Sequence, residues 1–207
     1  MKRWGMADEE KYREQPTQTP LADLVGSQGS IKLVENTIYF YSEIDGISCS
    51  ELNRLLREID QRLSLVAATM QAEAFTPTIH LRINSYGGDV FAGLSTVDTI
   101  RNLKSKVYTY IEGAAASAAT IISVAGNKRF IGKNSFMLIH QLSAICSGTF
   151  ERLQDEHDNN KRIMTAIKNI YKEYTKIPMK ELDAILKRDI WFDSETCLRH
   201  GLVDVIL

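Results

Sequence analysis

Three short stretches between positions 83 and 141 decide how this chain folds: INSYGG (83–88), GAAASAA (113–119) and MLIHQ (137–141). Each follows or closes an apolar run of the kind found in buried strands, and each then changes abruptly to glycine, serine or histidine. We interpret all three as strand ends, where the chain turns and polar side chains become available for binding or chemistry.

The segments around these stretches alternate between strand-like and helix-like periodicity. Residues 78–84 alternate apolar and polar side chains, and residues 106–112 are rich in Val, Tyr, Thr and Ile, so both are predicted strands. Gly87-Gly88 predicts a turn into a helix, Gly113 is expected to end the second strand, and a further strand is predicted at 136–139. Such alternation predicts an α/β fold with parallel strands and outer helices, although periodicity alone allows a doubly wound sheet as well as a spiral.

The flanking sequence predicts the remaining elements from its caps and breakers. In chain order we expect a strand or hairpin over 32–41 bent at Glu35-Asn36, a helix capped by Ser48 or Ser50, an alanine-rich helix from about Ser117 to Gly126, a loop over 126–130, a charged helix over 150–175, a helix from Pro178 through Leu186, a helix capped by Ser194 and ended by Gly201, and a strand over 202–206.

Ser117 and His140 are the candidate reactive residues. A hydroxyl at a strand-to-helix turn lies near free amides and the positive end of a helix, where an attacking oxygen and a developing oxyanion are both stabilised. An imidazole supplies the base that a serine nucleophile needs. Taken singly, a serine in such a turn is usually a cap and a histidine at a strand end is usually structural. It is their occurrence together, in this order, that suggests catalysis.

These motifs resemble the proteolytic subunit family of the Clp protease, ClpP. The resemblance rests on Asn84-Ser85-x-Gly87-Gly88, Gly113-x-Ala115-Ala116-Ser117, Met137-x-Ile139-His140-Gln141, and a C-terminal signature of Arg188-Asp189 followed by Gly201-Leu202-Val203-Asp204. It covers about residues 32–207. It implies the ClpP/crotonase-like spiral of repeated βαβ units with an extended handle helix.

The resemblance also implies a serine endopeptidase that cleaves unfolded polypeptides to short peptides inside a ring chamber. Ser117 matches the nucleophile, His140 the base, and Asp189, rather than Asp183 or Asp193, the acid that orients the base. The amides of Gly88 and Ala118 match the oxyanion hole, and Val90 falls beside the peptide-binding groove. We expect a heptameric ring, alone or stacked as a tetradecamer, and an AAA+ Clp ATPase unfoldase as partner. No cofactor or metal is expected.

Composition is that of an ordinary soluble protein and excludes several classes. The 207 residues are 44% hydrophobic and 25% charged with a net charge of −1, so neither a nucleic acid nor a membrane is an expected partner. Cys49, Cys146 and Cys197 are odd in number and widely spaced, which predicts free thiols rather than disulfides or a metal site. We expect a cytoplasmic protein.

The expected organisation is one protease domain, 31–207, that includes a handle over about 141–176. Residues 1–30 are polar and contain two of the four prolines, Pro16 and Pro20, which predicts a flexible arm. In the resembled family this segment includes a removable propeptide and the loops of the axial pore.

Several residues depart from the family pattern. Ala118 replaces the usual Met after the nucleophile, and Tyr86 and Leu142 replace prolines, which is expected to loosen the oxyanion turn and the start of the handle. Lys187 replaces an acid that pairs with Arg across the ring–ring contact. His80 and Arg82 stand where the family has aromatic residues that help to form ATPase-docking pockets.

Two alternatives to an active protease follow from the sequence. A non-catalytic or modulatory ring subunit would co-assemble with an active ClpP, and a crotonase-type acyl-CoA enzyme would share the fold without needing the serine and histidine pair. The presence of Ser117, His140 and Asp189 together favours the active protease.

Overall fold

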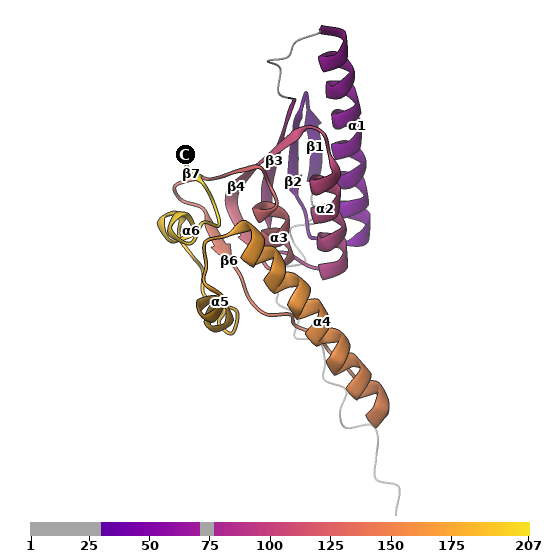
Figure 1. Cartoon of the computed structure of the whole chain (residues 1–207), viewed down its shortest axis with the longest axis vertical. Coiled ribbons are helices and arrows are strands. Elements are labelled where there is room, and N and C mark those ends of the chain that lie inside the picture. Colours follow the sequence, from indigo (N-terminus) through magenta and orange to yellow (C-terminus); the bar gives the residue numbers. More distant parts are fainter. Residues whose placement is uncertain (1–29, 71–76) are drawn as a thin grey trace, which may run out of the picture.

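The structure is a computed structural model that describes residues 30–70 and 77–207. Its centre is a seven-stranded sheet in the order β1-β2-β3-β4-β5-β7, with β6 paired to β4 (Figure 1). The strands are β1 (Ser30–Val34), β2 (Thr37–Tyr41), β3 (Thr78–Ser85), β4 (Lys106–Ala116), β5 (Lys128–Ile131), β6 (Phe136–Leu138) and β7 (Val205–Ile206). The helices are α1 (Gly46–Met70), α2 (Val90–Asn102), α3 (Ala118–Val124), α4 (Phe150–Tyr174), α5 (Met179–Ile185) and α6 (Ser194–His200).

The sheet is built from βαβ units, as predicted. Among the strands named above only β1 and β2 pair antiparallel, and every other pair is parallel. Parallel neighbours need a crossover, and α1, α2 and α3 supply the first three in turn. The expected α/β fold with parallel strands joined by helices is therefore confirmed.

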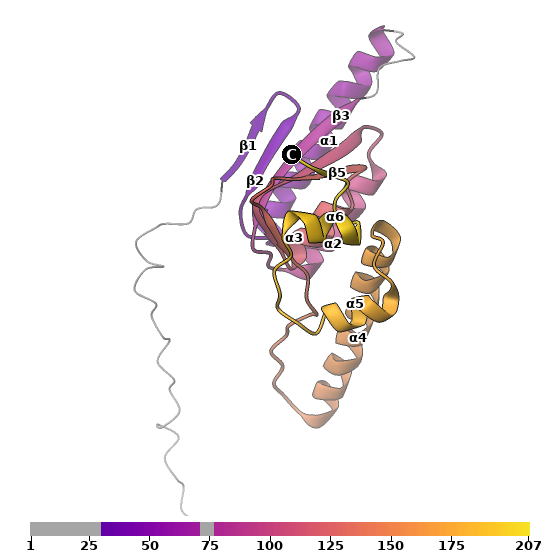
Figure 2. The same ribbon diagram turned by 90° about the vertical axis from the view of Figure 1, so that its left-hand side faces the viewer.

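The helices cover one face of the sheet. Along β3 the side chains of Ile79, Leu81 and Ile83 are fully buried beneath them, whereas His80 and Arg82 on the opposite face are half-buried. Helix α1 packs on α2, α2 on α3, and α3 on α4. Figure 2 shows strands β1 and β2 on one side of the molecule and the helices on the other.

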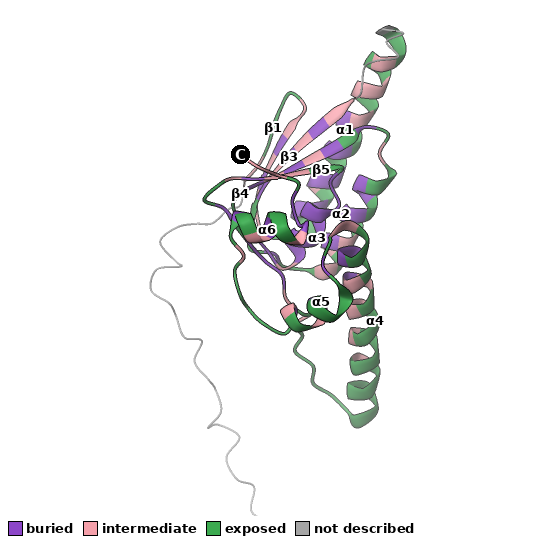
Figure 3. Cartoon of the chain, turned by 60° about the vertical axis from the view of Figure 1, so that its left-hand side comes forward, coloured by how far each residue is buried: buried purple, intermediate pink, exposed green. Residues whose placement is uncertain are grey.

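Helix α4 extends away from the body as an arm. Its buried residues, Ile167, Ile170 and Tyr171, are all in its C-terminal half, where it contacts the domain. The N-terminal half and the segment 143–149 before it are largely exposed (Figure 3). The predicted charged helix is thus present, and its N-terminal half extends free of the domain.

The prediction that Gly113 ends a strand is wrong. Gly113 adopts φ +79° and bends β4, which then continues to Ala116. The bend is held by two side chains, because Ser135 Oγ accepts from the Gly113 amide and Asn84 Oδ1 from the Ala114 amide. Before the bend β4 pairs with β5, and after it with β6, so the strand ends directly before Ser117.

The prediction of a loop over 126–130 is also wrong, because residues from Lys128 onward form β5, which lies between β4 and β7. Arg129 on this strand holds the C-terminal segment. Its guanidinium pairs with the Asp204 carboxylate at 2.6 Å and also donates to the carbonyl oxygens of Gly201 and Tyr174. This segment therefore fastens the end of the chain.

Smaller differences concern caps and ends. Helix α1 begins at Gly46, where Asp45, rather than Ser48 or Ser50, accepts the first amide bond, from Ser48 N. Asp193, rather than Ser194, caps α6. The last strand is limited to Val205–Ile206. Ser30 pairs with Tyr41, so the sheet begins one residue before the predicted domain boundary, and the rest of the predicted arm, residues 1–29, lies outside the described residues.

Removing the Arg129 pairing should destabilise the protein in a pH-dependent way. Burial raises the pKa of the Asp204 carboxyl, but hydrogen bonds and charge from Arg129 outweigh it and hold that pKa below its ordinary value. The pair therefore stabilises the fold above the ordinary carboxyl pKa, and this contribution is lost as the pH falls. Because Asp204 is partly exposed, we expect Asp204→Asn to lower the free energy of unfolding by about 1 kcal/mol near neutral pH. Urea unfolding should show this difference shrinking toward about pH 3; a constant difference would contradict the assignment.

None of the helices in the described part of the chain is long and apolar enough to cross a membrane.

Candidate active site

Ser117 occupies a sharp junction between β4 and α3. Its backbone has φ 53° and ψ −127°, a combination that a non-glycine residue seldom adopts and that costs roughly 1–3 kcal/mol. The junction is held because the Ser117 amide donates to the carbonyl oxygen of Leu138 on β6, at 2.9 Å. The side chain is half-buried and makes no helix-cap hydrogen bond, so the hydroxyl is available to a substrate.

The Gly87-Gly88 turn lies directly against Ser117. A Cβ added to Gly87 would lie 2.6 Å from the Ser117 Cβ and 2.7 Å from the Ala116 carbonyl oxygen, so only glycine fits. Gly88 forms an isolated parallel bridge with Ile44, which fixes the turn from its other side. Among the described residues no acceptor is found for the amides of Gly88 and Ala118. Two free N–H groups beside a hydroxyl are what an oxyanion hole requires.

His140 reaches the same place from β6. Because β6 pairs in parallel with the end of β4, residues just beyond β6 lie alongside Ser117. The His140 Nδ1 atom is 2.6 Å from the backbone carbonyl oxygen of Gln141. A carbonyl oxygen only accepts, so Nδ1 carries a proton, and in the neutral imidazole Nε2 is then the nitrogen with a free lone pair. This is the tautomer that a general base needs.

These residues line one cleft of about 440 Å³. Ser117, His140, Gly88, Ala118 and Val90 all border it, so five predicted site residues are brought together. The remaining wall is mainly apolar and comes from α2, α3, the 141–144 segment and α4. Its apolar members include Phe91, Ile121, Leu142, Ile163, Ile167 and Tyr171. Within the described residues Ser117 and His140 share the cleft without a hydrogen bond between them.

Asp189 is near this cleft but does not line it. Segments 137–141 and 186–192 run antiparallel: Met137 and Phe192 exchange backbone hydrogen bonds of 2.9 and 2.7 Å, and the Gln141 amide donates to Leu186 at 2.7 Å. Asp189 lies midway between these two contacts on one segment, and His140 lies between them on the other. Its carboxylate is exposed and has no hydrogen bond or ion pair within the described part of the chain.

The other histidines lie elsewhere. His80 bonds to Tyr110 on the open face of the sheet, His157 is exposed on α4, and His200 stacks on Phe192. The described residues contain no group of three or more His, Cys, Asp or Glu side chains arranged to hold a metal ion.

Sequence reasoning missed two features of this site. The backbone carbonyl of Gln141 orients His140. Every residue has such a carbonyl, so the sequence could not indicate this contact. Tyr86, at the mouth of the cleft, packs edge-on against Trp191, with ring centroids 6.1 Å apart. The replacement of a family proline by Tyr86 was the available signal. At Leu142 the backbone amide donates to Met164 Sδ, a bond that proline could not make.

Comparison with known proteins identifies the family. The model of the family described as Clp protease matches residues 52–207, most of the chain. The chain belongs to the Clp protease family. A ClpP-type "ATP-dependent Clp protease proteolytic subunit" from Cyanophora paradoxa is 32% identical over 178 residues, covering 84% of this chain and 86% of that protein. The protein of the same description from Deinococcus radiodurans is 32% identical and covers 70% of this chain and 72% of its own length.

A solved structure agrees with the fold. A mutant of ClpP1 from Listeria monocytogenes superposes with a TM-score of 0.72 and 24% identity, covering 84% of this chain and 91% of that one. The residues matched by the Clp protease family model include Ser117, His140 and Asp189. The chain is thus a member of a protease family with a ClpP-like fold.

Proposed function

We propose that this ClpP family member is an active serine endopeptidase that cleaves unfolded polypeptides to short peptides. The observation that carries the proposal is the junction of Ser117, the free amides of Gly88 and Ala118, and a correctly tautomeric His140 in one cleft. Ser117 and the Ala118 amide follow β4, the Gly88 amide follows β3 and His140 follows β6, so three strand ends supply these groups.

The chemistry follows from the geometry. Ser117 Oγ attacks the scissile carbonyl carbon while its proton passes to His140 Nε2. The oxyanion that forms accepts hydrogen bonds from the amides of Gly88 and Ala118. The His140 proton then goes to the leaving amine as the C–N bond breaks. Water, deprotonated by His140, then attacks the acyl carbon, the bond from that carbon to Ser117 Oγ breaks, and His140 returns the proton to Ser117 Oγ. Asp189 is proposed to stabilise the cationic imidazole once the two segments close around a substrate.

The test of the function is hydrolysis of a fluorogenic short peptide and of an unfolded protein by the purified full chain. We expect products from both, sensitive to a serine-directed inhibitor. Absence of hydrolysis at every assembly state would favour the non-catalytic subunit instead.

We further propose that residues 31–207 form one protease domain whose handle, residues 141–176, takes part in assembly. A heptamer would have a mass of about 164 kDa, seven times 23.4 kDa, and a stacked tetradecamer about 328 kDa. The exposed N-terminal half of α4 supports this proposal, because exposed apolar residues such as Ile145, Phe150 and Leu153 lie on or just before it. The free thiols of Cys49, Cys146 and Cys197 fit a cytoplasmic location.

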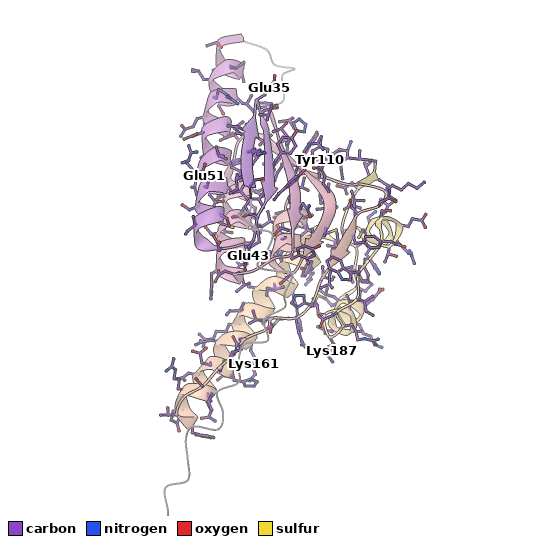
Figure 4. All side chains as sticks on the ribbon, turned by 180° about the vertical axis from the view of Figure 1, so that it is seen from behind. Glu35, Glu43, Glu51, Tyr110, Lys161 and Lys187 are labelled. Carbon is purple, nitrogen blue, oxygen red and sulfur yellow. The ribbon has the colours of Figure 1, made fainter. Side chains whose placement is uncertain are left out.

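Lys187 should weaken the contact between two rings. It lies exposed at the end of α5, beside the exposed Arg188 (Figure 4). Where the family has an acid to pair with that arginine, two like charges repel, and salt screens the repulsion. We expect Lys187→Asp to shift the population from 164 kDa toward 328 kDa in light scattering at low salt. A double ring in the parent at low protein and low salt, unchanged by the substitution, would contradict this.

A usual Clp ATPase should dock poorly on the open face of the sheet (Figure 4, near Tyr110). Arg82 lies over the Tyr110 ring at 4.9 Å and pairs with Glu112, so its guanidinium stays on this face rather than extending into solvent. His80 is held by Tyr110 at 2.8 Å, and burial and the charge of Arg82 lower the pKa of His80, which keeps it neutral near pH 7. An aliphatic anchor, worth roughly 1.5–3 kcal/mol in an apolar pocket, would meet the Arg82–Glu112 ion pair and the His80–Tyr110 hydrogen bond instead of an apolar surface.

The measurement is ATP-dependent degradation of a tagged, folded substrate by this chain with a standard Clp ATPase. We expect little stimulation, and a gain when His80 and Arg82 are both replaced by Tyr. Saturable stimulation of the parent chain at sub-micromolar ATPase would refute the proposal.

A further inference from the structure

We infer that the ring contact between Tyr86 and Trp191 is a positioning brace, which holds the Asp189 segment and the Gly87-Gly88 turn in a fixed relation. The inference rests on the proposed peptidase function and adds two residues to its machinery. Neither residue is assigned to the reacting atoms; both act through the groups next to them.

The segment that carries Asp189 has few other restraints. Its ends are fastened to the His140 segment through Leu186 and Phe192. Between these ends residues 187–191 are all exposed, and their one backbone hydrogen bond runs locally from the Arg188 amide to Ile185. The Trp191 ring packs edge-on against Tyr86 and so ties this stretch to the oxyanion turn.

The other half of the contact belongs to the oxyanion turn. Tyr86 directly precedes Gly87, which touches Ser117, and its ring meets that of Trp191 at 87° with centroids 6.1 Å apart. Edge-to-face pairs of this geometry are attractive beyond their buried area. A proline at position 86 would restrict the backbone by itself, but tyrosine does not. The aromatic contact supplies a restraint of another kind.

Exposure argues that the pair has a purpose other than core packing. The Tyr86 residue is 75% exposed and Trp191 is 42% exposed, so both rings lie at the surface, and Tyr86 borders the cleft. The ring contact links the Gly87-Gly88 turn to the Asp189 segment. The backbone hydrogen bonds of Phe192 and Leu186 link the Asp189 segment to the His140 segment.

The kinetic test compares variants of the full chain in fluorogenic-peptide hydrolysis. Tyr86→Ala and Trp191→Ala should each lower kcat roughly threefold to tenfold, with KM changed less than about twofold. Tyr86→Phe keeps the ring and should retain activity, and Ile47→Ala, an exposed apolar residue of α1 outside the cleft, is the matched control. In an Asp189→Asn background Trp191→Ala should cost less than about twofold more, because both changes act through the same group.

If the losses of kcat in Trp191→Ala and Asp189→Asn were fully additive, the brace would be overturned. A rise in KM at unchanged kcat would also overturn it, because the rings would then bind substrate instead. Amide hydrogen exchange supplies a readout that needs no activity. In Tyr86→Ala the amides of residues 187–191 should exchange faster than in the parent, while that of Phe192 stays protected. Unchanged exchange would overturn the inference, whereas a parent chain that hydrolyses nothing but shows this change would sink the proposed function and leave the brace supported.

Discussion

Ser117→Ala should reduce peptide hydrolysis by roughly four orders of magnitude while leaving the fold intact. The reason is that the Ser117 hydroxyl is the proposed nucleophile that forms the acyl intermediate, and the residual rate would come from binding and from the Gly88 and Ala118 amides alone. The fold should persist because the side chain makes no cap hydrogen bond, and alanine removes a single oxygen. Burst-free steady-state kinetics with the peptide would measure the loss.

The matched variants separate the members of the site. His140→Ala should be crippled to a similar degree, since the base and nucleophile act as a unit. Asp189→Asn should be milder, because the carbonyl of Gln141 already fixes the His140 tautomer. Retention of more than a tenth of parental activity in Ser117→Ala, with circular dichroism unchanged, would show that the nucleophile is misassigned.

Gly87→Ala should lower kcat by at least roughly a hundredfold. The φ of Gly87 is +98°, which alanine rarely adopts, and the added Cβ would meet Ser117 Cβ at 2.6 Å and the Ala116 oxygen at 2.7 Å. The two neighbours are the Ala116 backbone carbonyl and Ser117, whose backbone is already strained, so neither can shift without moving the chain at the end of β4. The turn must shift instead, and the Gly88 amide leaves the position where the oxyanion forms.

Gly46→Ala is the control for this substitution. A Cβ at Gly46 would have no atom within 4 Å, and its φ lies outside the left-handed region, so alanine in α1 should be neutral or slightly stabilising. The peptide assay and thermal unfolding should be run on both variants. Near-parental kcat in Gly87→Ala would mean that the turn is not part of the oxyanion site.

The parts of the fold that follow from local chemistry were predictable. The change from INSYGG to a helix, and from a β-branched run to GAAASAA, each concentrates the turn signal within a few residues. For the same reason Glu35-Asn36 was correctly identified as the bend of the first hairpin, where Glu35 takes φ 56°. Ser117 and His140 could be singled out from sequence because both follow predicted strands, whereas the roles of Asp189, Gly88, Ala118 and Val90 came from the resemblance to the family.

The misses have physical causes. Lys128–Ile131 is four residues long with two cations, so its strand character comes from its neighbours in the sheet and not from its own pattern. Gly113 was expected to end a strand, but the side chains of Asn84 and Ser135 satisfy the amides at the bend and let it continue. Arg129 with Asp204, and Tyr86 with Trp191, are partners distant in sequence, and residue type alone does not pair them.

Covalent labelling with a serine-directed phosphonate, followed by peptide mass mapping, tests the central claim most directly. The reagent needs an activated hydroxyl and an oxyanion hole together, and ordinary serines do not react with it. We predict a single modification on Ser117, lost in His140→Ala and slowed in Gly87→Ala. A folded, assembled chain that stays unmodified at Ser117, or is modified at another serine, would contradict the account.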